Sequence, residues 1–280
     1  MPDVLNLLKR HARQSGMRLD IVEKDYALSY LLAGLSTSPL ADHLVLKGGT
    51  ALRKCYYRGY RFSEDLDFST RLPGHPPNLE ADFHFAIRAM QALLNERGLF
   101  DVRQEPLILR QPHPFDQAAF LVYVRFPHHR QPLCRLKVEI TTDEPLLLPP
   151  VVRSLFHDYD EPLDAKVAVY SLAEIVAEKL RALLQSAERL RQRGWGASRV
   201  CRDYYDLWEI LRREASLPPL RNLVEQKCRQ RGISFESLEQ FFAAPLKEEA
   251  YREWKNQILP FVPVAPSPEQ VLSELESLLR

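Results

Sequence analysis

The sequence predicts an α+β domain followed by an all-helical domain. Segments 118–126 and 133–141 alternate apolar and polar side chains, as strands with one buried face do. A short apolar run at 44–46 precedes two glycines and a helical segment, which is typical of a strand-to-helix turn. From about residue 166 onward the patterns are helical. We therefore expect domains at 1–165 and 166–280.

The first domain is expected to begin with two helices, because apolar residues recur there at helical spacing. A Pro- and Gly-rich loop at 71–78 separates a second strand from the next helix. In chain order the expected elements are helices 3–14 and 19–35, strands 44–46 and 64–69, a helix at 80–98, and strands 118–126 and 133–141.

Composition excludes several classes of protein. The 280 residues carry 38 basic and 37 acidic side chains, and a net charge of +1 excludes a highly basic nucleic-acid coat protein. No apolar run approaches the roughly 20 residues of a membrane helix, and no secretory signal is visible. The four cysteines are scattered without a C-x-x-C pair, so neither a zinc site nor a disulfide framework is expected. We expect a cytoplasmic protein with free thiols and no membrane partner.

Two carboxylates mark the predicted strand 64–69. Asp65 and Asp67 lie two residues apart, so both side chains leave the same face of the strand. Neighbouring carboxylates repel unless a cation lies between them, and Mg²⁺ takes one or two carboxylates plus phosphate oxygens. The alternative is an exposed polar face at a sheet edge. If strand 133–141 is a neighbour, Glu139 adds a third carboxylate, and three could hold two metal ions.

A glycine turn lies just upstream of these carboxylates. Small residues at Gly48 and Gly49, followed by Thr50, would let a phosphate approach the backbone at a helix N-terminus. The alternative is an ordinary tight turn. Ser63 could contact phosphate or only form a turn, and Arg61 could do the same or be a solvated charge. The paired histidines at 128–129 have no partner nearby in the sequence and are interpreted as a loop.

A lysine falls on the apolar face of the helix predicted at 171–185. Ser171 and Glu174 form an S-x-x-E capping box that marks the helix start. Lys179 lies inside the apolar stripe, whereas Glu174 and Arg181 lie outside it. A lysine on a buried face is uncommon unless it snorkels to the surface or has an anionic partner. That partner could be a Glu on another helix, or a phosphate held by the lysine.

Positive charge gathers around and after this lysine. Residues 179–202 contain seven basic side chains against one acidic side chain, a local charge of +6. We interpret the stretch from Arg189 to Gly196 as a mobile basic loop suited to RNA or a nucleoside triphosphate. The alternative, a solvated helix end, accounts for some of the arginines. Asp203 could be only an N-cap, or it could lie beside Lys179 to orient it or act as a base. The basic residues are Lys179, Arg181, Arg189, Arg191, Arg193, Arg199 and Arg202.

Four blocks in order resemble the AbiEii/AbiGii-type nucleotidyltransferase toxins. The resemblance spans roughly 23–210, and residues past 215 carry none of it. The N-terminal helix EKDYALSYLL at 23–32 is also similar to that family. The blocks are KGGTAL at 47–52, RFSEDLDFS at 61–69, AEKLRALL at 177–184 and RDYYDLWEI at 202–210.

The resemblance implies a polymerase-β-like nucleotidyltransferase domain with a mixed sheet, followed by a helical domain. It also implies the toxin of a type IV toxin–antitoxin or abortive-infection system, with a cognate antitoxin encoded nearby. Glu139 is a weaker match, because an Asp is more usual there. The motif positions are Gly48, Gly49 and Thr50 for the glycine motif, Ser63, Asp65 and Asp67 for the metal motif, Lys179 for the third motif and Asp203 for the fourth.

The expected function is transfer of a nucleotide from an NTP to RNA, the 3′ end of tRNA being the expected acceptor, with a block of translation. Asp65 and Asp67 would bind Mg²⁺, Lys179 would neutralise triphosphate charge, and Asp203 would hold Lys179 or help deprotonate the attacking hydroxyl. Pyrophosphate would leave. The alternatives are transfer to a protein hydroxyl and an NTP- or GTP-binding protein without transfer. A plain RNA-binding protein fits the composition least well.

Overall fold

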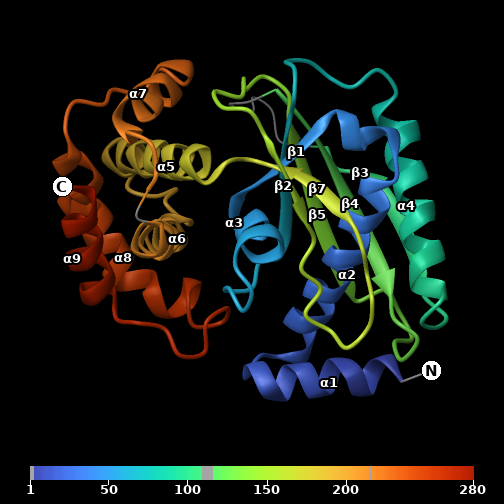
Figure 1. Cartoon of the computed structure of the whole chain (residues 1–280). Coiled ribbons are helices and arrows are strands. Elements are labelled where there is room, and N and C mark those ends of the chain that lie inside the picture. Colours follow the sequence, from blue (N-terminus) through green and yellow to red (C-terminus); the bar gives the residue numbers. More distant parts are fainter. Residues whose placement is uncertain (1–2, 109–115, 215) are drawn as a thin grey trace. The chain divides into compact units, whose positions relative to one another are not determined.

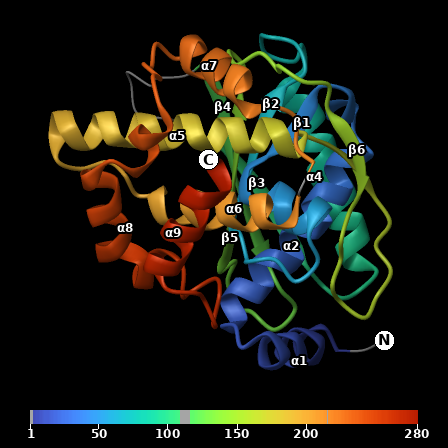
Figure 2. The same cartoon turned by 60° about the vertical axis from the view of Figure 1, so that its left-hand side comes forward.

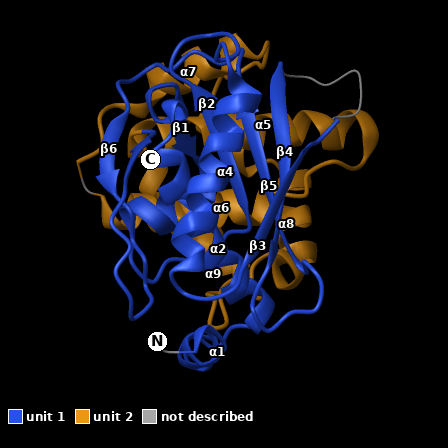
Figure 3. Cartoon of the chain, turned by 90° about the vertical axis from the view of Figure 1, so that its right-hand side faces the viewer, with its two compact units in different colours: residues 1–170 blue, residues 171–280 orange. Residues whose placement is uncertain are grey.

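The chain divides after Tyr170 into a unit with a β-sheet and a unit whose described elements are all helical (Figure 3). The computed structural model describes residues 3–108, 116–214 and 216–280. The units comprise Met1–Tyr170 and Ser171–Arg280. This confirms the predicted fold class, an α+β region followed by a helical region. The expectation that residues from about 166 onward are helical is wrong for Lys166–Val169, which form a strand of the sheet. Four residues are too few to show a strand period.

A seven-stranded mixed sheet forms the centre of unit 1 (Figure 1). Two neighbouring pairs, β2 with β5 and β1 with β7, are parallel, and the other pairs are antiparallel. The strands, in spatial order, are β3 (Asp101–Pro106), β4 (Gln117–Arg125), β5 (Cys134–Thr141), β2 (Asp65–Thr70), β1 (Leu44–Lys47), β7 (Lys166–Val169) and β6 (Val151–Ser154).

The two faces of this sheet differ in polarity. On one face Leu66, Val138 and Phe120 lie opposite each other across three adjacent strands, and all three are buried. Helices α2 (Leu19–Ser36) and α4 (Leu79–Asn95) pack side by side on this face (Figure 1), where Phe83 of α4 stacks on Phe120 at 4.1 Å between ring centroids. The apolar face therefore forms the core, and the polar side chains of the same strands point the other way.

Three strands were not predicted from the sequence, and they lie toward the sheet edges. The side chains of β6 are all exposed, and those of β3 are exposed or half-buried. An edge strand with little burial shows little hydrophobic alternation, so the period-2 signal is absent. The predicted helices agree with α1 (Val4–Ser15), α2 and α4 to within a few residues, and a short 3₁₀ turn, η1 (Pro39–Asp42), follows α2.

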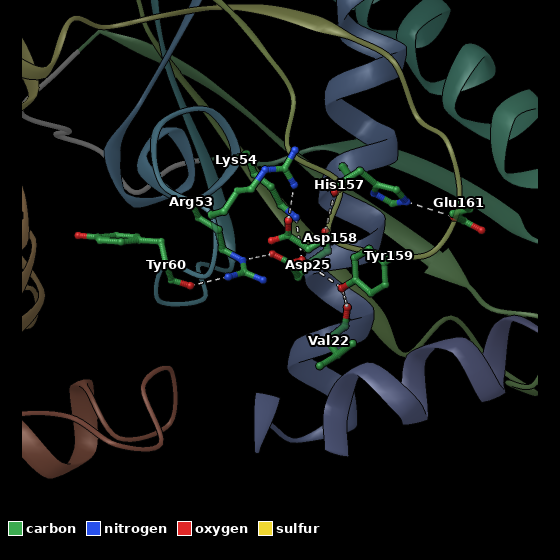
Figure 4. A network of polar contacts seen from close by, with 11 residues as sticks. Val22, Asp25, Arg53, Lys54, Tyr60, His157, Asp158, Tyr159 and Glu161 are labelled. Atoms are coloured by element: carbon green, nitrogen blue, oxygen red, sulfur yellow. Dashed lines mark hydrogen bonds and ion pairs between the residues drawn. The ribbon is translucent and has the colours of Figure 1, made fainter. Parts of the chain in front are cut away.

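A buried ionic network joins α2 to the turn that follows β1 (Figure 4). That turn consists of α3 (Gly48–Ala51) and a π-helical segment, η2 (Leu52–Tyr56). The carboxylate of Asp25 in α2 accepts from Arg53, from Lys54 at 2.7 Å and from the hydroxyl of Tyr159 at 3.0 Å. Asp25 is fully buried. The network therefore fixes the segment that carries the glycine turn.

In unit 2, α5 packs against α6, α7 and α8, and α9 packs against α6 and α8 (Figure 2). Lys227 of α7 and Glu174 of α5 form a buried ion pair at 2.9 Å, so Glu174 is buried even though it lies outside the apolar stripe of α5. Within the described residues, no helix has the length and apolar character needed to cross a membrane. The elements are α5 (Leu172–Arg193), α6 (Val200–Arg213), α7 (Leu220–Gln230), η3 (Leu238–Phe242), α8 (Ala244–Gln257) and α9 (Pro268–Leu279).

Candidate active site

A row of charged side chains crosses the polar face of the sheet in unit 1. The register places Lys47 of β1 opposite Asp67 of β2, and Asp67 opposite Glu139 of β5. Asp65 lies two residues from Asp67 and opposite Lys137. The condition on which the role of Glu139 depended, that strand 133–141 neighbours strand 64–69, is therefore met. Residues opposite each other share a face, so the carboxylates of Asp65, Asp67 and Glu139 lie on one surface.

Gly48 brings the backbone against Asp67. The carboxylates of Asp65, Asp67 and Glu139 are called the acidic row below. The φ of Gly48, +74°, lies in the left-handed region that favours glycine. A Cβ at this position would lie 3.1 Å from Oδ2 of Asp67. The residue is therefore small for two reasons, its backbone conformation and its closeness to a carboxylate. Glycine at this position therefore keeps a side chain away from the Asp67 carboxylate.

Thr50 bonds the glycine turn to β2, and Arg61 packs against the same turn. The Thr50 hydroxyl donates to the backbone carbonyl of Asp65 at 2.5 Å. A Cβ at Gly49 would lie 2.5 Å from Nη2 of Arg61, so the guanidinium packs directly against that glycine. Arg61 is buried, which rules out its interpretation as a solvated charge. Ser63 is half-buried in the segment that leads into β2.

The three carboxylates do not converge on one point. Glu139 forms an ion pair with Lys137 at 2.8 Å, and its Oε1 also accepts from Gln117 at 3.4 Å. Among the residues that the structure describes, three metal-binding side chains come within 4.8 Å of one another only at a different place, considered below. Asp65 and Asp67 are both half-buried. Both side chains offer oxygen donors and are partly accessible. Such a site suits a hard cation such as Mg²⁺, which keeps several water or phosphate ligands.

A second cluster lies within unit 2. Nζ of Lys179 is 2.9 Å from Oδ1 of Asp203 and 2.7 Å from Oδ2 of Asp206. Lys179 is buried, as its place in the apolar stripe predicted, and its partners are two aspartates rather than a glutamate. Asp203 lies in the first turn of α6 and is not the N-cap, which is Arg199. Asp206 was missed, although its i,i+3 spacing from Asp203 puts both on one helix face.

The basic cluster differs from the expected mobile loop. Helix α5 continues through Arg193 and ends at Gly194, whose φ is +72°, so Arg189 and Arg193 lie on a helix. Burial, followed by the charges of Arg181, Arg193 and Arg199, lowers the pKa of Arg189. Arg189 therefore lies close enough to the other three arginines to be repelled by them.

The curated proteins searched contain no match to this chain. A family model described as "Nucleotidyl transferase AbiEii toxin, Type IV TA system" matches residues 30–275. The chain belongs to the AbiEii family. It is accordingly a nucleotidyltransferase toxin of a type IV toxin–antitoxin system, and membership implies a nucleotide substrate and an antitoxin partner. The AbiEii match also agrees with the fold, a mixed sheet followed by a helical region.

Substituting Gly48 with Ala should show whether glycine is needed in the glycine turn for its backbone conformation or for its closeness to Asp67. Gly48→Ala is expected to lower nucleotidyl transfer at least about tenfold, because a Cβ would crowd Asp67, and to lower the free energy of unfolding by about 1–2 kcal/mol. Gly59→Ala is the matched control, since φ is +67° and nothing lies within 4 Å of its Cβ. It should lose similar stability and keep its activity. Equal activity losses in the two variants would exclude a role for the contact with Asp67.

Proposed function

We propose that this toxin transfers a nucleotide from an NTP to a hydroxyl of RNA, at the 3′ end of tRNA, and thereby blocks translation. The observation that carries this proposal is the pair of half-buried carboxylates, Asp65 and Asp67, on the polar sheet face beside the glycine turn. This arrangement combines a site for a divalent cation with space for a phosphate. Phosphoryl transfer depends mainly on such positioning and charge neutralisation.

Mg²⁺ is the cation that this donor set fits best. Asp65 and Asp67 supply carboxylate oxygens without nitrogen or sulfur donors, and their partial exposure leaves room for water and phosphate ligands. A Cβ at Gly48 would occupy the space next to Oδ2 of Asp67. A bound ion would neutralise negative charge on the triphosphate and on the leaving pyrophosphate. Glu139 is proposed as an additional ligand. To bind the ion, its carboxylate would first have to leave the ion pair with Lys137.

The side chains of unit 1 would position the NTP. Gly48 lets a phosphate oxygen approach the backbone, and the Arg61 guanidinium behind Gly49 places positive charge next to it. Thr50 fixes the glycine turn relative to β2 through its hydrogen bond to the carbonyl of Asp65. Ser63 is a further proposed phosphate contact. The RNA hydroxyl oxygen forms a bond to the α-phosphorus, the bond from that phosphorus to the β-phosphate oxygen breaks, and pyrophosphate leaves while the hydroxyl proton passes to a carboxylate or water.

Lys179 is proposed to neutralise triphosphate charge, with Asp203 as the residue that orients it. The contact of 2.9 Å between them supports the role in which Asp203 holds Lys179. Asp206, fully buried, gives the lysine a second anchor. These two contacts fix the orientation of the Lys179 ammonium group. A fixed orientation suits a group that has to neutralise the charge of a triphosphate.

The basic cluster favours RNA as the acceptor. Arg193 and Arg199 are exposed, and the exposed ring of Trp195 lies between them in the chain, with the Arg193 guanidinium 6.0 Å from its centroid. Cations next to an accessible aromatic ring are what a single-stranded nucleic acid end can bind, by phosphate contact and base stacking.

Labelling the acceptor tests this proposal directly. The protein would be incubated with each α-³²P-labelled NTP, Mg²⁺, total tRNA and purified antitoxin, and the products separated on denaturing gels. Label on tRNA is the expected result, and the NTP that supplies it identifies the base. Label on protein alone would favour a protein hydroxyl as acceptor, and nucleotide binding without pyrophosphate release would favour a binding protein.

Neutralising the exposed arginines should weaken RNA binding. Arg193→Gln and Arg199→Gln are each expected to raise the Kd for tRNA several-fold and to reduce the slope of log Kd against log salt by about 0.7. Arg191→Gln, in the same cluster, should change the Kd less, because Glu188 already pairs with Arg191 at 2.6 Å. Filter binding at three salt concentrations measures both quantities. Unchanged tRNA binding in both Arg193→Gln and Arg199→Gln would mean that the acceptor does not contact these arginines.

A further inference from the structure

Two histidines and a glutamate from distant parts of unit 1 converge outside the acidic row. Nε2 of His128 lies 2.8 Å from Oε1 of Glu23, and Nε2 of His129 lies 3.2 Å from the same oxygen. Glu23 is on α2, and the histidines are in the loop between β4 and β5. We propose that Glu23, His128 and His129 form a binding site for a transition-metal ion of the zinc type.

The distances suit such an ion. Zinc binds histidine nitrogen and carboxylate oxygen at about 2.0–2.2 Å in a tetrahedral arrangement, which places neighbouring ligand atoms roughly 3.3 Å apart. The two measured separations from Glu23 lie close to this value, and the three ligand atoms all lie within 4.8 Å of one another. Small side-chain shifts would therefore complete three positions of a tetrahedron, and water would take the fourth.

The surroundings hold the ligands in place and leave an entry path. Glu23 is buried, whereas the side chains of His128 and His129 are 16% and 13% exposed. The ring of Phe126 lies 5.5 Å from each imidazole ring, which restricts their rotation. An ion bound here would tie the start of α2 to the β4–β5 loop. The site would therefore be structural, within unit 1.

This donor set selects a different metal from that of the acidic row. Imidazole nitrogen favours zinc, copper, nickel or iron, whereas Mg²⁺ prefers oxygen alone. Cysteine spacing did not reveal the site because it contains no cysteine. Glu23 also lies more than 100 residues from the histidines in sequence, and it precedes the family match that begins at residue 30.

One feature limits the affinity. Binding through Nε2 moves the imidazole hydrogen to Nδ1, and neither Nδ1 has a hydrogen-bond partner among the described residues, although both are buried. Loss of such outer partners typically weakens metal sites about 10- to 100-fold. We therefore expect zinc binding about 10- to 100-fold weaker than at a comparable site whose histidines have such partners.

Titration of the full-length protein tests the site. Chelator-treated protein would be titrated with Zn²⁺ against a fluorescent zinc indicator, and with Co²⁺ while the visible absorption is recorded. The wild type should bind one equivalent at this site and show the intense visible bands of tetrahedral Co²⁺. His128→Ala, His129→Ala and Glu23→Gln should each weaken this binding at least tenfold. His84→Ala, on the exposed side of α4, should bind as the wild type does.

The outcome is independent of the proposed function. Asp65→Asn and Asp67→Asn should keep the Zn²⁺ equivalent, and zinc binding is measured without NTP or RNA. Absence of binding in the wild type would overturn the proposal, as would binding that survives all three ligand substitutions. Circular dichroism of each variant checks the fold, and the wild-type titration decides the question even where a variant unfolds.

Discussion

Replacing Asp67 with Asn is expected to reduce nucleotidyl transfer at least about a hundredfold while leaving the fold intact. Asp67 is half-buried on the polar face, so the substitution opens no cavity and removes no core contact. It does remove negative charge from the place where the glycine turn and the acidic row meet. A cation there is held chiefly by charge, and an amide oxygen is a poor substitute for a carboxylate.

Asp65→Asn should behave in the same way, and the double variant should lose little more than either single variant. Groups that act as one unit give strongly non-additive losses. Asp164→Asn is the control, because Asp164 is an exposed carboxylate of the same unit away from strand β2. Incorporation of labelled nucleotide, with thermal unfolding measured in parallel, separates activity from stability. Full activity in either Asp65→Asn or Asp67→Asn would refute the metal assignment.

The common face of the candidate site residues of unit 1 could be predicted because a strand has a fixed period of two. Asp65 and Asp67 had to share a face, and the alternation in 133–141 placed Glu139 on the polar side of its own strand. What the sequence left open was which strands are neighbours, and the parallel pairing of β2 with β5 decides it. The contact of Lys179 with Asp203 was predictable for a similar reason, since a lysine inside an apolar stripe requires an anionic partner.

Other features could not be predicted because they depend on contacts between residues distant in sequence. Glu174 lies outside the apolar stripe of α5, yet it is buried because α7 brings Lys227 against it. Arg61 is buried against Gly49, and no local sequence pattern predicts this contact. The partner of His128 and His129 lies on α2. Periodicity describes one element at a time, so it cannot reveal the charge that a second element supplies.

Replacing Asp25 with Ala is expected to lower the free energy of unfolding of unit 1 by about 3–5 kcal/mol. The substitution leaves Arg53 and Lys54 buried without their shared carboxylate, and it removes an acceptor of the Tyr159 hydroxyl. Lys54 can relieve part of the cost by releasing its proton, but Arg53 cannot, because its guanidinium stays charged. The loss is a large fraction of the stability of a typical domain. Urea unfolding followed by circular dichroism measures it.

The pH dependence and a control on the same helix make this expectation specific. Burial raises the pKa of Asp25, but Arg53 and Lys54 lower it more strongly, so its net value lies well below the ordinary one. The stabilisation should therefore be complete above about pH 5, where the unfolded carboxyl is also ionised, and shrink at lower pH as the unfolded chain takes up a proton. Asp20→Ala breaks an exposed pair with Arg18 at 2.9 Å and should cost less than about 1 kcal/mol. Similar losses in both variants would mean that the buried network does not hold the glycine turn in place.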